Sequence, residues 1–298
     1  MYLGPIIDPH HHLWDLSMGK HPWLSASDPP DQAVAGLADI AQDYLVDDYV
    51  RDTRGHNLVA TVHIEALWAG DPVGETRWLE SLDKPNGVAA RYVAGAPLGR
   101  PGAEAAIAEQ ASFERVAGIR GILSCHPDPA KCFVDDPELG RDPAWRRDVA
   151  RLERHKLHLE LMMYPYQARI VREIAEANPG LQIIVNHCGS PIDRDSEGMR
   201  RWREGLKLIS ACPNVALKIS NPGAYDRSWT LESVREVVMQ CIDCFGAQRS
   251  MFGSDSPVSK IQMSFDQIYA AFKTIASPLT AQEQAGLFHD NAKRFYRL

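Results

Sequence analysis

Histidine and aspartate residues at three places in the sequence have the types and spacing of a metal-assisted hydrolytic site. The first place is the run of three histidines at positions 10–12. Side chains alternate along an extended strand, so His10 and His12 point to the same side and His11 points to the other. The other two places are His187 and Asp255, each of which ends a short apolar run. We expect the first pair and the later two residues to meet at one site.

The four residues His10, His12, His187 and Asp255 favour a divalent metal ion as cofactor. Imidazole nitrogens and a carboxylate oxygen suit Zn²⁺ best, with Mn²⁺ as the second choice. Such an ion lowers the pKa of bound water and polarises a carbonyl group. Asp255 would then act as the general base, and His187 would act either as a ligand or as a stabiliser of the oxyanion. The alternative is a polar network without metal, satisfied by water and by backbone groups.

Eight apolar runs rich in β-branched residues alternate with helical patterns, and they predict the elements that position these side chains. The predicted strands are residues 5–11, 58–66, 88–96, 118–124, 157–162, 181–187, 215–220 and 250–255. Eight strand–helix units in about 250 residues are typical of an α/β protein with a (β/α)8 barrel, the TIM barrel. Since no long linker divides the chain, we expect one domain over residues 1–298. In a barrel the strands end on one face, which is where active sites form.

Helix-start signals support the alternation of strands and helices. Asp71 and Asp142 each precede a proline, which favours an N-cap followed by proline at the first helical position. Ser264 and Thr280 each begin a capping box. We therefore expect a helix to start at each of these four positions.

Two charged residues on the predicted strands are candidates for substrate contact. Arg120 lies on the fourth strand, and its planar guanidinium suits a carboxylate; the alternative is an ion pair buried inside the barrel. Glu65 lies at the end of the second strand, where it would bind substrate hydroxyls or hold a ligand histidine. Lys218, on the seventh strand, is interpreted as a paired residue of the barrel interior.

Aromatic residues and one histidine that follow strand ends are further candidates for the substrate pocket. Trp14, Trp68 and Tyr164 would form walls that suit a sugar or a ring, although packing under a loop explains each of them equally well. His126 opens a long loop, residues 126–141, and would either contact substrate or be solvated. Long loops in compact domains are usually functional.

Five motifs together resemble the amidohydrolase superfamily. They are Asp8-x-His10-x-His12, Gly-Ile-Arg-Gly-Ile at 118–122, Val-Asn-His-Cys-Gly at 185–189, Leu-Lys-Ile-Ser at 217–220 and Phe-Gly-Ser-Asp-Ser-Pro at 252–257. Within the superfamily the chain is similar to the amidohydrolase-related (amidohydrolase 2) branch, which includes sugar lactonases, sulfomuconolactonase and pyrone-dicarboxylate lactonase.

The resemblance implies a barrel, a hydrolase and a mononuclear metal at His10, His12, His187 and Asp255, with Arg120 in the active site. The fourth strand ends Ile-Leu-Ser-Cys at 122–125, so the bridging lysine of binuclear relatives has no match. Some lactonases of this branch work without metal, which makes a metal-independent site the alternative.

The function that we expect is ring-opening of a lactone, either a sugar lactone or a muconolactone- or pyrone-type dicarboxylate lactone. Asp255 would take a proton from a metal-bound water and return it to the leaving alkoxide. The alternative enzyme is a non-oxidative decarboxylase of the aminocarboxymuconate-semialdehyde type. Cys-Gly-Ser after His187 and Ser-Pro after Asp255 favour the lactonase. A binding protein without catalytic activity would be expected to lack at least one of the four candidate site residues, and this sequence has all of them.

Composition limits the partners. The 298 residues include 32 Lys and Arg against 39 Asp and Glu, a net charge of −7, which disfavours nucleic acid and anionic membranes. A small anionic or polyhydroxylated substrate remains compatible with local arginines. No run of about 18 apolar residues predicts a membrane span. The amino terminus lacks the features of a secretion signal, and six dispersed cysteines are typical of a reducing cytoplasm. The sequence is compatible with a homo-oligomer and does not indicate an oligomeric state.

Overall fold

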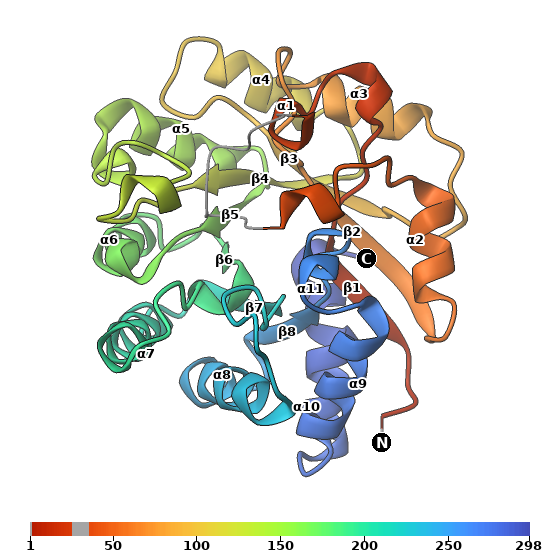
Figure 1. Cartoon of the computed structure of the whole chain (residues 1–298). Helices are drawn as coiled ribbons and strands as arrows, with labels where there is room; N and C mark the ends of the chain where they lie inside the picture. Colours follow the sequence, from red (N-terminus) through yellow and green to blue (C-terminus); the bar gives the residue numbers. More distant parts are fainter. Residues whose placement is uncertain (1, 26–35) are drawn as a thin grey trace.

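Eight parallel strands form the centre of the computed structural model, which describes residues 2–25 and 36–298 (Figure 1). The strands are paired in sequence order from β1 to β8. Their bounds are β1 Ile6–His11, β2 Leu58–Ile64, β3 Arg91–Gly95, β4 Val116–Ile122, β5 His158–Met162, β6 Ile183–Val185, β7 Val215–Ser220 and β8 Ser250–Gly253. Each of the eight predicted runs overlaps one of these strands, and β4 begins two residues before its run; the predicted order of the elements is confirmed.

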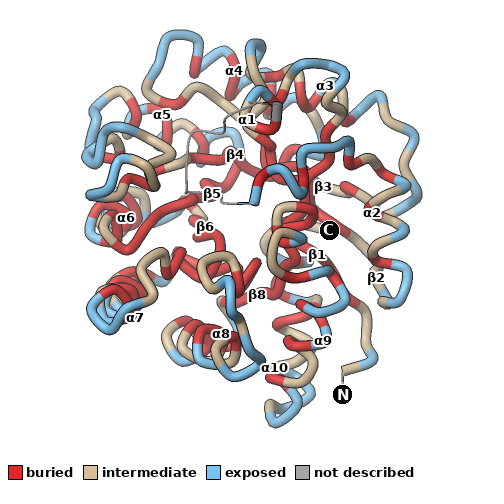
Figure 2. Tube along the Cα trace, viewed as in Figure 1, coloured by how far each residue is buried: buried red, intermediate tan, exposed pale blue. Residues whose placement is uncertain are grey.

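Helices surround the strands. The α-helices are α1 Pro22–Ser25, α2 Val46–Thr53, α3 Gly74–Ser81, α4 Ala103–Gln110, α5 Pro143–Arg154, α6 Ala168–Ala177, α7 Ser196–Ser210, α8 Leu231–Phe245, α9 Phe265–Ala276, α10 Ala281–Ala285 and α11 Asn291–Tyr296. Figure 2 shows buried strands at the centre and exposed segments at the periphery. The main core lies between the strands and the inner faces of these helices.

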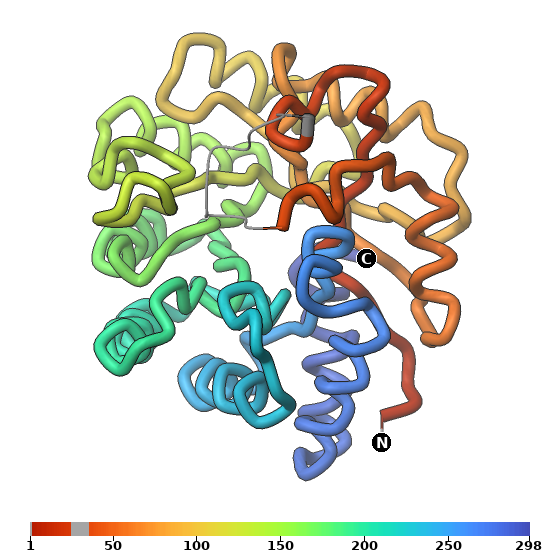
Figure 3. Tube along the Cα trace, in the orientation of Figure 1, coloured from red at the N-terminus to blue at the C-terminus, as the bar shows by residue number. Residues whose placement is uncertain are grey.

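The first and last strands lie side by side (Figure 3), and backbone hydrogen bonds at and just beyond their carboxyl ends close the barrel. The N–H of Asp255 donates to the carbonyl of His10 over 2.8 Å, and the N–H of His12 donates to the carbonyl of Ser256 over 2.7 Å. The predicted (β/α)8 barrel is therefore confirmed. Closure brings the end of β1 beside the end of β8, so two of the candidate site segments become neighbours.

Three of the four predicted helix caps are confirmed, and one prediction is wrong. The side chains of Asp142, Ser264 and Thr280 accept backbone N–H groups at the starts of α5, α9 and α10. Asp71 instead accepts the N–H of Val73 over 3.1 Å, and α3 begins at Gly74. The aspartate–proline pair at 71–72 thus forms a turn before the helix.

The amino-terminal end of the barrel is closed by the last helix. Tyr296 of α11 is buried in a small apolar cluster with strand residues such as Ile7 and Val62. Its hydroxyl donates to Glu160 Oε2 over 2.8 Å. Lys218 Nζ forms an ion pair with Glu160 Oε1, and both side chains are fully buried. The interpretation of Lys218 as a paired interior residue is confirmed. In the described residues, no helix combines the length and the apolar character that crossing a membrane would require.

Candidate active site

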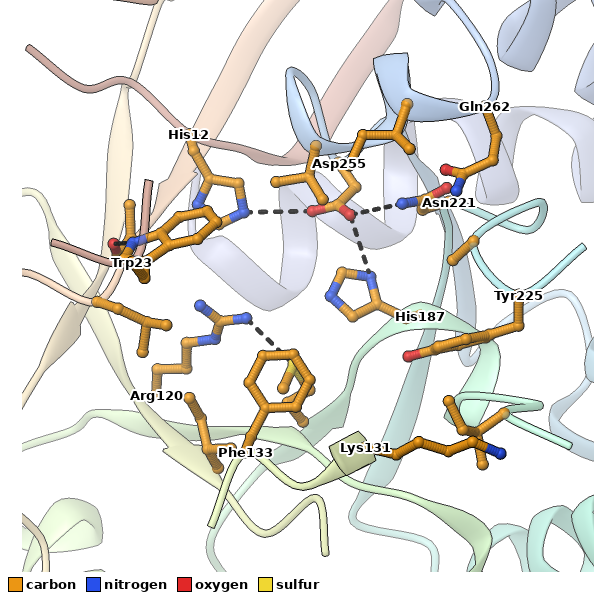
Figure 4. A pocket seen from close by; sticks show the side chains of 18 of the residues that line it. His12, Trp23, Arg120, Lys131, Phe133, His187, Asn221, Tyr225, Asp255 and Gln262 are labelled. Atoms are coloured by element: carbon orange, nitrogen blue, oxygen red, sulfur yellow. Dashed lines mark hydrogen bonds and ion pairs between the residues drawn. The ribbon is translucent and has the colours of Figure 1, made fainter. Parts of the chain in front are cut away.

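A cavity of about 320 Å³ opens at the carboxyl ends of the strands. This is the face of a (β/α)8 barrel on which active sites form, and the volume suits a small molecule. Figure 4 shows Asp255, His12 and Asn221 on one side and Arg120 and Phe133 on the other. The labelled wall also includes Trp23, Lys131, His187, Tyr225 and Gln262.

Asp255 is held by contacts to both of its carboxylate oxygens. Oδ1 lies 3.2 Å from Nε2 of His10 and 3.2 Å from Nε2 of His12. Oδ2 accepts the side-chain N–H of Asn221 over 2.9 Å and lies 3.9 Å from Nδ1 of His187. Burial would raise the pKa of Asp255, but His187, His12 and Asn221 outweigh it and hold that pKa below its ordinary value. Asp255 is therefore an ionised carboxylate at neutral pH.

The hydrogen bonds of His12 determine which of its nitrogens faces Asp255. Nδ1 lies 2.8 Å from the carbonyl oxygen of Ile64. Because a carbonyl can only accept, Nδ1 carries a proton, and in the neutral ring Nε2 has a lone pair. Nε2 lies 3.2 Å from Asp255 Oδ1, so it donates a hydrogen bond to the carboxylate when the ring is doubly protonated and presents this lone pair when the ring is neutral. A proton or a cation between the two atoms would relieve the repulsion, and this is the ring orientation of a metal ligand.

His10 and His187 are both buried and neutral. Burial lowers the pKa of His10 well below its usual value, and neighbouring cationic groups lower it further. Burial likewise lowers the pKa of His187 to about 4 against the opposing attraction of Asp255. Among the described residues, no hydrogen bond reaches either ring nitrogen of His10. Neutral imidazoles beside an ionised carboxylate are the protonation states that metal ligands require.

These residues fit a divalent ion. His10, His187 and Asp255 each offer one ligand atom, and the three atoms lie within 4.8 Å of one another. His12 approaches the same group through its 3.2 Å contact with Asp255 Oδ1. Both ring nitrogens of His10 lack a hydrogen bond in the described part of the chain, and a bound ion would give one of them, and Nε2 of His12, a partner.

Left-handed backbone conformations turn three side chains into the cavity. His187, Asn221 and Asp255 have φ angles of 50°, 43° and 64°. Each residue follows a strand closely, and the reversal of φ ends the extended chain there. This explains why β6 ends at Val185 although the predicted strand ran to residue 187. Such conformations cost non-glycine residues about 1–3 kcal/mol each and cluster at functional sites.

Arg120 lines the cavity, and its guanidinium uses only some of its hydrogen-bond donors within the described part of the chain. Its Nη1 donates to the backbone carbonyl of Glu65 over 2.8 Å, and the same atom lies 3.5 Å from Glu65 Oε1. Its Nε has no partner among the described residues, and Nη2 has only a 3.6 Å contact with the sulfur of Met162. Glu65 accepts the N–H of Leu67 through Oε2 over 2.8 Å and is absent from the described cavity wall. Glu65 thus orients Arg120, while Arg120 retains capacity for an anion.

The three predicted aromatic residues are placed behind the described cavity wall. Trp14 is fully buried, its ring is 6.2 Å from that of His12, and its Nε1 donates to the carbonyl of Gln42 over 2.7 Å. Tyr164 is fully buried and donates to the carbonyl of Lys131 over 2.9 Å. The ring of Trp68 packs 5.9 Å from that of Trp78. In this structure all three support wall residues or neighbouring helices.

His126 lies in a hydrogen-bonded network at the base of its loop. Its Nε2 lies 3.0 Å from Asp193 Oδ1, and its Nδ1 accepts the N–H of Asp128 over 2.9 Å. Tyr166 also donates to Asp193, over 2.8 Å. The network anchors the loop that brings Lys131 and Phe133 to the cavity.

Sequence reasoning missed most of the wall residues that loops supply. Lys131, Phe133 and Tyr225 carry no periodic signal. Lys131 contributes the aliphatic part of its side chain to the cavity wall, because its Nζ forms an ion pair with Asp193 at 3.3 Å. Arg227 also lines the cavity and is exposed, and it has neither a hydrogen bond nor an ion pair within the described part of the chain. Asn221 could have been found, since it directly follows β7 as a polar residue after an apolar run.

Comparison with known proteins assigns the family. The amidohydrolase sequence profile matches residues 7–298. This chain belongs to the amidohydrolase family. The match covers nearly the whole sequence, so the resemblance carried by the five motifs is confirmed, and the expected hydrolase is confirmed with it.

The relatives of this amidohydrolase align with nearly its whole length. An uncharacterized protein of Sinorhizobium fredii, y4mH, is 38% identical over 98% of both chains. An L-fucono-1,5-lactonase of Burkholderia multivorans is 28% identical over 98% of this chain and 96% of its own. The crystal structure of a B. multivorans amidohydrolase with bound HEPES has a TM-score of 0.83 at 27% identity, over 99% of this chain and 100% of its own. A second crystal form of that amidohydrolase has bound zinc; it has a TM-score of 0.81 at 25% identity, with the same coverage.

Proposed function

We propose that this amidohydrolase is a lactonase, which opens a cyclic ester by adding water. The observation that carries the proposal is Asp255, an ionised carboxylate in the cavity wall with both oxygens oriented by neighbours. The L-fucono-1,5-lactonase relatives, which match 98% of this chain, support the same reaction class. Ester opening needs a base at the attacking water and an acid at the leaving alkoxide, and one carboxylate can serve both steps in turn.

In the proposed reaction Asp255 acts as general base and then as general acid. Its carboxylate takes a proton from the attacking water and later gives that proton to the alkoxide that leaves the ring. Asn221 fixes Oδ2, so that Oδ1 faces His10 and His12. A divalent ion held by His10, His187 and Asp255, with His12 beside them, would polarise the lactone carbonyl and favour ionisation of water. Zn²⁺ is the ion that we propose, with Mn²⁺ second.

We further propose that the substrate carries a carboxylate. Within residues 2–25 and 36–298, Arg120 keeps unused guanidinium donors at the cavity, and Arg227 adds a cation without an ion-pair partner at the wall. A planar guanidinium binds a carboxylate in a bidentate manner. Two available arginines at one cavity in a chain of net charge −7 favour an anionic lactone over a neutral sugar lactone.

A panel of lactones tests the proposal. The purified protein, with and without added Zn²⁺, is given neutral sugar lactones, muconolactone and 2-pyrone-4,6-dicarboxylate. A pH indicator follows proton release, and NMR identifies the ring-opened acid. Turnover of at least one lactone, with carboxylated ones preferred, is expected. Release of carbon dioxide from aminocarboxymuconate semialdehyde without any lactone turnover would overturn the lactonase and favour the decarboxylase.

A further inference from the structure

Two thiols face each other in the loop that forms one wall of the cavity. Sγ of Cys125 lies 3.6 Å from Sγ of Cys132, and both cysteines are free. A disulfide bond is about 2.05 Å long, so the two sulfurs would have to approach by about 1.5 Å. Cys125 follows β4, and Cys132 ends a short 3-10 turn at Pro129–Lys131. A small movement of the loop would bring the two sulfurs into bonding distance.

Cys125 and Cys132 differ in burial, and this difference indicates which thiol reacts first. Cys132 is half-buried, and its sulfur contacts both the backbone N–H and the backbone carbonyl of His126, each over 3.1 Å. Cys125 is buried, and burial together with the hydrogen bond to Cys132 raises the pKa of its thiol to about 11. Cys132 is therefore the sulfur that an outside reagent reaches first, and Cys125 lies behind it as the second thiol.

The residues before and after Cys132 both belong to the cavity wall. Lys131 and Phe133, its neighbours in sequence, line the cavity. The carbonyl of Lys131 accepts the hydroxyl of Tyr164 over 2.9 Å, and the N–H of Phe133 donates to the carbonyl of Ser124 over 2.9 Å. A displacement of Cys132 toward Cys125 must therefore also move Lys131 and Phe133, which line the cavity.

We propose that Cys125 and Cys132 form a reversible disulfide that adjusts this wall, with a low-molecular-weight disulfide as the oxidant. The thiolate of Cys132 attacks one sulfur of the oxidant, and one small thiol leaves. The thiolate of Cys125 then attacks the sulfur of Cys132, and the second small thiol leaves. The two protein thiols lose two electrons and two protons, and the oxidant is reduced to two thiols. Oxidation draws Lys131 and Phe133 away from the positions that they hold in the reduced loop.

Glutathione redox buffers applied to the full-length protein test the proposal. As the share of glutathione disulfide rises, we expect two protein thiols to disappear without any bound glutathione, and dithiothreitol to restore both. Peptide mapping should link residues 125 and 132. Unchanged thiol content, or a stable glutathione adduct on the native chain, would overturn the proposal.

Single variants test the order of attack. Cys125→Ser removes the second thiol and should trap glutathione on Cys132, whereas Cys132→Ser should give neither an adduct nor a disulfide. Cys244→Ser removes another half-buried thiol, in α8, and should still lose two thiols. Loss of any thiol, or a glutathione adduct, in Cys132→Ser would contradict the assignment.

Hydrogen exchange reports on the loop independently of lactone turnover. Amides of residues 126–134 should exchange more slowly in the oxidised protein, because the disulfide closes this segment. With any lactone that the panel identifies, oxidation should raise KM and leave kcat nearly unchanged, since Asp255 lies at the end of β8 on the other side of the cavity. That second readout rests on the proposed function. Unchanged exchange and unchanged KM after complete oxidation would exclude control of the wall by this pair.

Discussion

Nε2 of His12 lies 3.2 Å from Oδ1 of Asp255, although the two residues are 243 positions apart in the chain. Closure of the barrel produces this contact, because the ends of β1 and β8 are joined by backbone hydrogen bonds at the same level. Nδ1 of the same histidine is committed to the carbonyl of Ile64. One ring thus connects the ends of the first two strands with the carboxylate of the last.

Metal content is the first expected consequence of this arrangement. Elemental analysis of the purified protein should find about one equivalent of Zn²⁺ or Mn²⁺ per chain. The double variant His10→Ala/His12→Ala should contain almost none, because it loses the two imidazole rings whose Nε2 atoms each lie 3.2 Å from Asp255 Oδ1.

His11→Gln is the matched control for metal content. His11 lies in the same run but contacts Thr61 over 2.9 Å and stacks on Tyr49, outside the cavity. This variant should keep the metal. A native chain that contains no metal and turns over lactones in the presence of a chelator would favour the metal-independent alternative.

Replacement of Arg227 should separate anionic from neutral substrates. Arg227→Gln removes an exposed cation from the cavity wall without breaking any described hydrogen bond. Since an exposed ion pair contributes up to about 1 kcal/mol, KM for a carboxylated lactone should rise up to about fivefold, with kcat unchanged. Steady-state kinetics at low and high salt measure the effect. An equal rise in KM for a neutral lactone would show that charge is not the reason.

Stability toward acid should depend on the buried pair of Glu160 and Lys218. Burial would raise the pKa of Glu160, but Lys218 and His158 outweigh it and lower that pKa to about 2 from its ordinary 4.5. Because the folded-state pKa is the lower one, the stabilisation is complete above pH 4.5 and is lost as the pH falls from 4.5 toward 2. Urea denaturation of the native chain at several pH values should show this decline.

Variants of the pair test its part in that stability. Glu160→Gln leaves the ammonium of Lys218 buried without a counter-ion and should reduce the free energy of unfolding by about 3–5 kcal/mol at pH 7. The double variant Glu160→Gln/Lys218→Met should recover most of that loss and should show a weaker decline in acid. Equal stability of the single variant and the native chain would contradict the pairing.

The barrel could be predicted from sequence because strand periodicity and length are local properties. All eight strands lie where the apolar runs indicated, with ends that differ by a few residues; β3, for example, is shorter than the run at 88–96. The convergence of His10, His12, His187 and Asp255 also followed, since parallel strands in a barrel end on one face. The left-handed residues at the ends of β6 and β8 add the turns that point these side chains inward.

The rest of the wall could not be predicted because loops place it. Trp14 and Tyr164 follow strand ends as expected, yet their polar atoms bond to backbone carbonyls behind the described wall. Phe133 and Arg227 reach the cavity from loops whose paths depend on distant contacts, such as the pair of His126 and Asp193. No spacing rule in the sequence encodes such contacts.

Turnover by Asp255→Asn tests the central claim most directly. The variant keeps the size of the side chain and can still bond to Asn221 and His12, but it cannot accept a proton from water. With the best lactone of the panel, kcat should fall at least about a hundredfold, as expected for loss of a positioned general base, while the melting temperature stays close to that of the native chain. A kcat within about tenfold of the native value, in a folded variant, would contradict the assignment of Asp255 as the base of a lactonase.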